Sequence, residues 1–300
     1  MTAPGPLYPP FYPPAYPIVP VPAPVPERLL VNGEPITGWC DIEGLTNLIV
    51  APPPRGANVT VPGRHGVIRT PRKPRAAAEI VLPLWVKGVN RSDGNIPPRS
   101  AARLHENLDY LLTIFHGETV ELEYVRDDGT SRTVTAELAE EPVVAVRERS
   151  YPPLARLSVP LTLFDPFWTE DRDVATTITG VTGTAGALNA FAGSTAPITD
   201  AVITFYGPVS NPSLAIGDRW VRYNGVIAAG RQLVLECAHW RAGPGTGSTW
   251  SPDERQVYRE PGPCWLEIPP SYNALTATFT HTGGGSATVE IAGRRRFLSP

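Results

Sequence analysis

Proline and glycine are so frequent in this chain that they restrict what it can fold into. The 300 residues include 36 prolines and 27 glycines, two residue types that destabilise helix interiors. A hydrophobic content of 42% is nevertheless ordinary for a folded protein. These features predict a mainly β fold of short strands joined by turns, and the length favours two domains.

The first 28 residues differ in composition from the rest of the chain. Eleven prolines fall within the first 26 positions, and no charged side chain precedes Glu27. Polyproline II or irregular extended chain is expected for such a segment. It can be a flexible terminus or a docking arm, and we favour the arm because an uncharged, proline-rich segment loses little entropy on binding. Its aromatic side chains would fill grooves on a neighbour: Tyr8, Phe11, Tyr12 and Tyr16.

Residues 29–170 have the pattern of a small β-domain. The turn signal Asn32-Gly33 separates a strand at 29–31 from one predicted over 36–41, and another strand is predicted over 78–86. A hairpin is predicted over 120–138, because alternating apolar residues flank the turn signal Asp127-Asp128-Gly129. A last strand covers 157–163, where Pro160 suggests a sheet edge or a bulge.

One helix is predicted inside this domain, over about residues 100–116. Ser100 is a candidate N-cap and Gly117 a candidate C-terminal stop. His105 and Glu106 are expected on the solvent side, which leaves the helix a role in packing. The apolar positions form one stripe at helical spacing: Leu104, Leu108, Leu111, Leu112 and Phe115.

Residues 51–75 form a long irregular stretch that is basic and contains no acidic residue. A loop of this length inside a compact domain is usually functional or reaches a partner. It can be a solvated loop or a contact to an acidic patch on an adjacent subunit, and nucleic-acid contact is the weaker alternative. The basic residues of this candidate interface loop are Arg55, Arg64, Arg69, Arg72, Lys73 and Arg75.

Residues 171–300 read as entirely β. Residues 171–196 are expected to link the domains and begin a first strand, and further strands are predicted over 201–206, 219–223, 232–237, 264–268, 274–280 and 287–291. Turns are expected at Asn224-Gly225 and Gly283–Gly285. About seven short strands of this kind indicate a two-sheet sandwich of the galectin-like or jelly-roll type.

No motif for catalysis, a metal or a cofactor is present in the sequence. The five histidines are scattered, and the three cysteines lack metal or disulfide spacing, so buried reduced thiols are expected. The acidic pairs Asp127-Asp128 and Glu140-Glu141 are better explained as solvated surface than as glycosidase acids. A net charge of −3 argues against a dedicated nucleic-acid binder. The sequence also lacks a signal peptide and a membrane-spanning run, so we expect folding in a cytoplasm without a membrane partner.

Carbohydrate binding is a separate alternative for the second domain. Sugar sites on β-sandwiches use exposed aromatic side chains. Two of the four tryptophans of this domain, Trp220 and Trp265, fall in predicted strands, where an aromatic is more often part of the core. Trp240 and Trp250 flank the glycine-rich stretch 241–251 and are the better candidates for a surface contact with glycan.

Three stretches, in order, resemble a known family. The first contains Gly44-Leu45, residues 53–55 and 61–66 and the strand after them, and the second is Phe164-Asp165-Pro166-Phe167-Trp168 after the strand at 157–163. The third runs from Ala196-Pro197 through 205–212 to Tyr223-Asn224-Gly225. Together they resemble the distal tail (Dit-type) or minor tail proteins of long-tailed bacteriophages, especially those of actinobacterial phages. The proline-rich segment lies outside the family pattern.

The resemblance implies a structural virion protein with no enzymatic activity. Family members form a six-membered ring through a first domain similar to tail-tube subunits, and the second domain is a sandwich that projects outward. The implied partners are further copies of the chain, the tail tube protein, and the tail-tip hub and tape-measure proteins, with DNA present only in transit. The implied location is the tail tip, after assembly in the host cytoplasm. The sandwich would brace receptor-binding proteins or contact host glycan.

Two other classes compete with this interpretation. A carbohydrate-binding adhesin of the tail would need a sandwich with an exposed aromatic platform, and a tail-associated hydrolase would need an acid or a nucleophile in a cleft. The helix inside the first β-domain favours a ring component over a string of binding modules.

Overall fold

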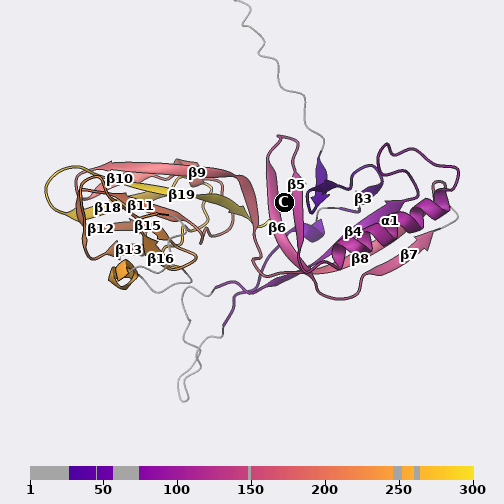
Figure 1. Ribbon diagram of the computed structural model, residues 1–300, viewed down its shortest axis with the longest axis horizontal. Helices are drawn as coiled ribbons and strands as arrows, with labels where there is room; N and C mark the ends of the chain where they lie inside the picture. The colour runs from indigo at the N-terminus through magenta and orange to yellow at the C-terminus, as the bar shows by residue number, and fades with distance from the viewer. Residues whose placement is uncertain (1–26, 45, 57–73, 148–149, 246–251, 260–263) are drawn as a thin grey trace, which may run out of the picture.

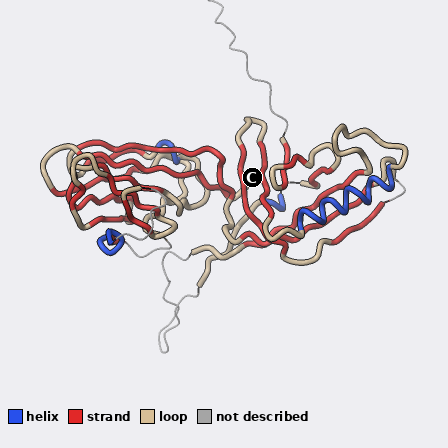
Figure 2. Tube along the Cα trace, viewed as in Figure 1, coloured by secondary structure: helices blue, strands red, loops and turns tan. Residues whose placement is uncertain are grey.

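The computed structural model describes residues 27–44, 46–56, 74–147, 150–245, 252–259 and 264–300, which form two lobes (Figure 1). Antiparallel strands make up most of both lobes, with one α-helix among the described residues (Figure 2). The predicted mainly β fold with one helix is therefore confirmed. No helix in the described part of the chain is long and apolar enough to cross a membrane.

The N-terminal domain combines two small sheets and the helix α1 (Ser100–Phe115). One sheet has the order β6-β5-β1-β2, and the other contains β3, β4, β8 and β7, with β8 between β4 and β7. The end of β6 also pairs with β8, which joins the two sheets. The strands are β1 (Arg28–Val31), β2 (Glu34–Pro35), β3 (Cys40–Ile42), β4 (Ala78–Lys87), β5 (Val120–Val125), β6 (Ser131–Leu138), β7 (Val143–Arg147) and β8 (Leu154–Leu163).

The helix packs along β4 and β8 through its predicted apolar stripe (Figure 1). Leu104, Leu108, Leu111 and Phe115 are buried, whereas His105 and Glu106 are exposed, as predicted. The predicted cap was wrong: Arg99 is the N-cap, and no side chain caps the helix. Ser100 begins the helix beside Gly88, the residue after β4: its carbonyl oxygen is 2.3 Å from where a Cβ on Gly88 would stand. A side chain at position 88 would therefore push the helix off the sheet.

Asn107 is fully buried on the packed face of α1, where an apolar residue would be expected. Its Nδ2 donates hydrogen bonds to the carbonyl oxygens of Lys87 and Val89, both at 2.9 Å. The side chain thus satisfies backbone groups at the end of β4, which would otherwise be buried without partners.

The strands of this domain depart from prediction in two places. Within the strand predicted over 36–41, residues 37–39 form a turn, and only Cys40 and Asp41 belong to a strand, the start of β3. Strand β8 is internal rather than an edge, since it pairs with β4 on one side and with β6 and β7 on the other. Pro160 is tolerated there because it falls between the residues that pair with β7 and those that pair with β6.

The hairpin of β5 and β6 has the predicted turn. Gly129 adopts φ 80°, and Asp128 Oδ1 accepts hydrogen bonds from the backbone N and the hydroxyl of Thr130, at 2.9 and 2.6 Å. These two bonds hold the pKa of Asp128 below its ordinary value.

The C-terminal domain is a two-sheet sandwich. One sheet has the order β16-β15-β11-β19-β9, and the other has the order β10-β18-β12-β13-β17, with β14 paired to β12. Its strands are β9 (Trp168–Gly180), β10 (Thr184–Ala187), β11 (Val202–Tyr206), β12 (Val209–Ile216), β13 (Arg219–Tyr223), β14 (Val226–Ile227), β15 (Gln232–Glu236), β16 (Arg241–Gly243), β17 (Val257–Arg259), β18 (Thr276–Thr282) and β19 (Ala287–Phe297). Three short 3-10 helices complete the described chain: η1 (Thr46–Leu48), η2 (Asn189–Phe191) and η3 (Pro252–Gln256).

Two predictions for the sandwich were wrong. Strand β12 was not predicted; it contains Asn211 and Pro212 at a shift of register between Ser210 and Ser213. Residues 264–268 do not form a strand, and only Ile268 makes an isolated bridge, to Ile198. Cys40, Cys237 and Cys264 are free and buried, as predicted.

Candidate assembly site at the domain junction

A long ribbon of two strands, β9 and β19, connects the domains. The pairing runs from Gly180 with Ala287 in the sandwich to Trp168 with Phe297 at the junction. Trp168 and Phe297 pack in the core of the N-terminal domain, whereas Ile178 packs in the core of the sandwich. Residues 171–180, expected as part of a linker, are therefore the continuation of one strand, and the predicted boundary at residue 170 falls inside β9 (Figure 1).

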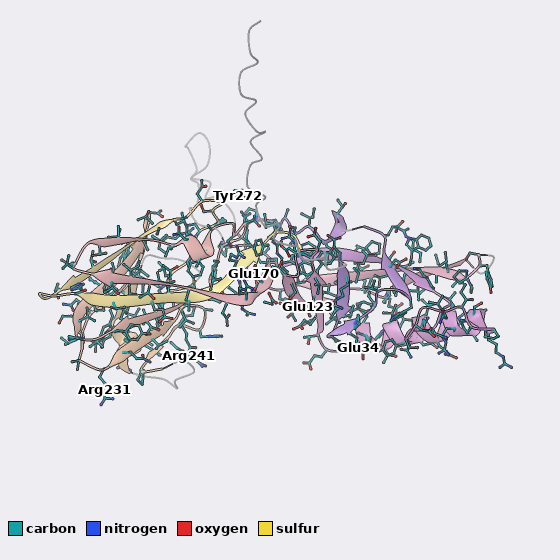
Figure 3. All side chains as sticks on the ribbon, turned by 90° about the horizontal axis from the view of Figure 1, so that it is seen from above. Glu34, Glu123, Glu170, Arg231, Arg241 and Tyr272 are labelled. Atoms are coloured by element: carbon teal, nitrogen blue, oxygen red, sulfur yellow. The ribbon has the colours of Figure 1, made fainter. Side chains whose placement is uncertain are left out.

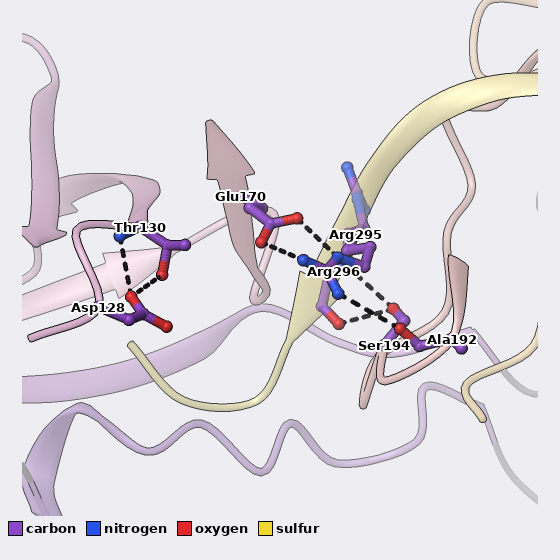
Figure 4. Close-up of polar contacts among 7 residues, drawn as sticks. All are labelled: Asp128, Thr130, Glu170, Ala192, Ser194, Arg295 and Arg296. Carbon is purple, nitrogen blue, oxygen red and sulfur yellow. Dashed lines mark hydrogen bonds and ion pairs between the residues drawn. The ribbon is translucent and has the colours of Figure 1, made fainter. Parts of the chain in front are cut away.

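Glu170 lies where the ribbon passes between the lobes (Figure 3). It pairs across the sheet with Arg132 of β6, and only 3% of its surface is exposed. Arg295 Nε and Nη2 donate to Glu170 Oε2 and Oε1, at 2.7 and 2.5 Å (Figure 4). Such a two-point contact fixes both position and orientation of the two side chains.

The next residue, Arg296, reaches residues on both sides of the junction. Its Nη2 lies 2.7 Å from Asp165 Oδ2, in the segment between β8 and β9, and 3.4 Å from Asp200 Oδ2 in the sandwich. The backbone of Arg296 is also held in place, because its N–H donates a hydrogen bond to Ser194 Oγ at 3.1 Å (Figure 4). Arg296 is thus a buried cation shared between the two domains.

Arg132 holds the last residues of the chain against the N-terminal domain. Its Nη1 donates to the carbonyl oxygens of Ser299 and Pro300, at 2.9 and 3.1 Å, and its guanidinium carbon lies 3.4 Å from the centre of the Phe297 ring. Burial, with a further contribution from the nearby positive charge of Arg126, lowers the pKa of Arg132 to about 10. The side chain remains charged at neutral pH.

A cleft of about 410 Å³ opens at this junction. Residues of the N-terminal domain and of the sandwich both line it, and several are apolar: Pro74, Phe164, Pro166, Phe167, Pro197 and Pro270. Its charged residues include Arg219 and Glu267, which form an ion pair at 3.0 Å. Phe164 is 62% exposed, which is high for a phenylalanine next to a domain junction.

Only the two ends of the predicted basic loop are described. Arg55 and Arg75 are exposed, and Arg55 N donates to the Pro74 carbonyl at 2.7 Å, so the two ends of the loop are paired. Arg75 also lines the junction cleft. The other residues of the predicted loop and arm lie outside the described residues: Arg64, Arg69, Arg72, Lys73, Tyr8, Phe11, Tyr12 and Tyr16.

Of the two tryptophans suggested for glycan contact, Trp240 is described and Trp250 lies outside the described residues. Trp240 is 37% exposed, but the Arg259 guanidinium stands 3.8 Å from its ring centre. Its ring also meets Trp265 edge-on, with centroids 6.4 Å apart. One face of the ring is therefore covered by a cation, and glycan contact stays a prediction.

The site residues at the junction were not found from the sequence. The run Arg294-Arg295-Arg296 inside an apolar strand was the available signal, because three consecutive cations beside a buried phenylalanine need anionic partners.

A second feature that the sequence analysis missed is β7, whose Val143, Val144 and Val146 are 66, 39 and 41% exposed. This strand pairs with β8 on one side and with no other strand among the described residues.

No group of three or more potential metal ligands lies together in the described ranges. The contacts described at the junction are ion pairs, apolar side chains and strand pairing. Proteins use such contacts to position domains and partners. These features define a two-domain, β-rich protein whose sandwich is joined to an N-terminal β-domain by a shared ribbon.

Comparison with solved structures identifies a similar architecture in the Dit protein of phage SPP1, described as a paradigm of the hub adsorption apparatus in phages that infect Gram-positive bacteria. The two chains share 12% identity with a TM-score of 0.56, over 90% of this chain and 99% of that one. The likeness shows a Dit-like fold. No protein-family model matches the sequence, and no curated protein matches it.

Proposed function

We propose that the chain is a structural subunit of a bacteriophage tail: a distal tail protein of a siphophage, which forms a ring of six copies at the tail tip. The observation that carries this proposal is the fold, because the likeness to SPP1 Dit extends through both domains and nearly the whole of that chain. Sequence identity of 12% is too low to transfer residue roles, so the assembly surfaces must come from this structure.

The exposed edge of β7 supports self-assembly through the N-terminal domain. Long unpaired strand edges that carry apolar residues invite pairing with another chain, and stable monomers usually protect them with charges or a covering element. Val143, Val144 and Val146 provide no such protection. A head-to-tail contact repeated around a closed ring would cover this edge in every copy.

In this proposal the ring joins the tail tube to the tail-tip hub and tape-measure proteins, as part of the baseplate, and DNA passes through its lumen during ejection. The sandwich then faces outward, where it braces receptor-binding proteins or contacts host glycan. The basic loop at residues 55–75 is the proposed contact to an adjacent subunit. None of these roles requires a catalytic group.

The test is the oligomeric state of the purified chain, measured by light scattering and negative-stain imaging. We expect rings of six copies, and Val144→Glu should reduce them to smaller species without unfolding the chain. Val226→Glu is the matched control, because Val226 is 74% exposed but lies on the sandwich. Immunogold labelling should then place the chain at the tail tip. A monomer that binds host glycan and is absent from tail tips would instead identify an adhesin.

A further inference from the structure

We propose that the junction cleft is the docking site for the chain's own N-terminal segment, residues 1–26. The inference does not depend on a tail function or on ring formation. It rests on the apolar character of the cleft, on the pairing of its charges and on the place where the described chain begins.

The cleft has the surface that a proline-rich ligand requires. Prolines from both domains and the two phenylalanines of the segment before β9 line it, and Phe164 is 62% exposed. Grooves that recognise proline-rich segments are lined by aromatic and other flat apolar side chains, because such a ligand has few donors and binds mainly through apolar contact. Residues 1–26 contain eleven prolines and four aromatic residues.

The charges in the cleft match an uncharged ligand. Two of the three cations that line the cleft are ion-paired, Arg219 with Glu267 at 3.0 Å and Arg296 with Asp165 at 2.7 Å. The third, Arg75, is exposed and donates to the Pro52 carbonyl at 3.3 Å. A charged peptide would have to compete with the two ion pairs. Residues 1–26 carry no charged side chain, so they can cover the apolar wall without disturbing them.

The position of β1 places the segment's attachment point close to the cleft. Arg28 pairs with Val125, Val125 pairs with Ser131, and the adjacent Arg132 pairs with Glu170 of β9. Three strand spacings of about 4.8 Å put the start of β1 roughly 15 Å from β9, which begins directly after the cleft residues 164–167. At about 3.1 Å per residue, fewer than ten residues cover that distance.

Because residues 1–26 are covalently attached to β1, even a weak contact with the cleft is enough to keep them bound there. A connection whose length matches the span between two sites gives an attached ligand an effective concentration on the order of millimolar. The aromatic residues between Tyr8 and Tyr16 stand at least ten residues before Arg28, so the connection is long enough for them to enter the cleft.

Cysteine cross-linking in the full-length chain tests the proposal. The three native cysteines are buried, and burial raises the pKa of each thiol, so introduced cysteines react selectively. Ala15→Cys would be combined with Pro270→Cys, an exposed position at the cleft, and treated with a short bis-maleimide. The matched control combines Ala15→Cys with Asp127→Cys, an exposed turn position two residues from the partner of Arg28.

Docking predicts that the pair with Pro270→Cys forms an intramolecular cross-link about tenfold faster than the pair with Asp127→Cys, because docking raises the effective concentration at the cleft alone. A freely moving segment would react at least as fast with position 127, which lies nearer to its attachment point, and that result would overturn the proposal. Cross-links only between chains would overturn it as well.

A second cysteine position in the cleft controls for any local effect of the Pro270→Cys substitution on the cross-linking rate. Arg75→Cys should cross-link to Ala15→Cys as Pro270→Cys does, since Arg75 is exposed at the same cleft and is not part of its apolar wall. Replacing Tyr8, Phe11, Tyr12 and Tyr16 by serine should reduce the rate at position 270 to the rate at position 127. An unchanged rate in that variant would show that the segment is not held by its aromatic side chains and would contradict docking.

Discussion

The two ends of the β9–β19 ribbon are built from different chemistry. In the sandwich, Ile178, Val289 and Ile291 are at most 3% exposed and face a purely apolar core. At the junction, Glu170 and Arg296 are nearly as buried, at 3 and 7% exposure, but they are charged. Apolar burial contributes stability in proportion to area and tolerates small shifts. Buried ion pairs contribute little net stability but demand one geometry. The ribbon therefore stabilises the sandwich at one end and orients the two domains at the other.

The largest effect is expected at the apolar end. Ile291→Ala should destabilise the sandwich by about 2–5 kcal/mol, because the side chain is fully buried and its removal leaves a cavity. Guanidinium unfolding followed by tryptophan fluorescence measures the change. Ser286→Ala, in the exposed turn before β19, should stay within about 0.5 kcal/mol of the wild type.

At the charged end, Glu170→Gln should cost about 1–3 kcal/mol, because it leaves Arg295 beside a neutral partner. The double variant Glu170→Leu with Arg295→Met should recover most of that loss. We expect the two domains of this variant to vary more in relative orientation, which small-angle scattering would detect as a broader distribution of interatomic distances. A double variant as unstable as the single one would show that the ion pair itself stabilises the fold.

A smaller effect is expected for Arg132→Met, of about 1–2 kcal/mol, because the change removes two hydrogen bonds but retains packing against Phe297. The sharper measurement is amide hydrogen exchange. The amides of residues 297–299 should exchange faster in the variant, while the amides of β11 and β18 should be unaffected. Faster exchange throughout the sandwich would mean that the C-terminal residues stabilise more than the junction.

The smallest effect is expected at the hairpin tip. The pKa of Asp128 is lowered by the hydrogen bonds from Thr130, so the folded state favours the ionised carboxylate. Its stabilising contribution is present above the ordinary pKa of about 4 and is lost as pH falls through the lower folded value. Because the carboxylate is exposed and solvent screens its charge, Asp128→Ala should be only about 0.5 kcal/mol or less below the wild type near pH 7, with a difference that disappears on acidification. Urea unfolding at both pH values measures it.

Much of the fold could be predicted because its signals are local. The helix stripe from Leu104 to Phe115, the turn at Gly129 and the alternation along β18 each depend on residues a few positions apart. Predictions failed where a neighbour in space changed the outcome. Pro160 suggested a sheet edge or a bulge, but it lies in an internal strand, between the residues that pair with β7 and those that pair with β6. Strand β12, which contains Pro212 at a register shift, was not predicted.

The candidate site could not be predicted in the same way. Glu170 meets Arg295 across 125 positions, and Asp165 meets Arg296 across 131. Nothing in the composition of either segment identifies the other as its partner. Residues 171–196 were expected to link the domains and begin a first strand, so the continuous strand β9, which brings these residues together with β19, was not predicted.

The sequence by itself determined the class of the fold: proline and glycine exclude long helices, alternating apolar residues specify strands, and one stripe at helical spacing specifies the helix. The tertiary structure decided how the domains are joined, which cations are neutralised and which strand edge stays open. The reason is physical. Backbone preference and side-chain periodicity act within a few residues, whereas ion pairing and strand pairing act through space and depend on where the whole chain has folded.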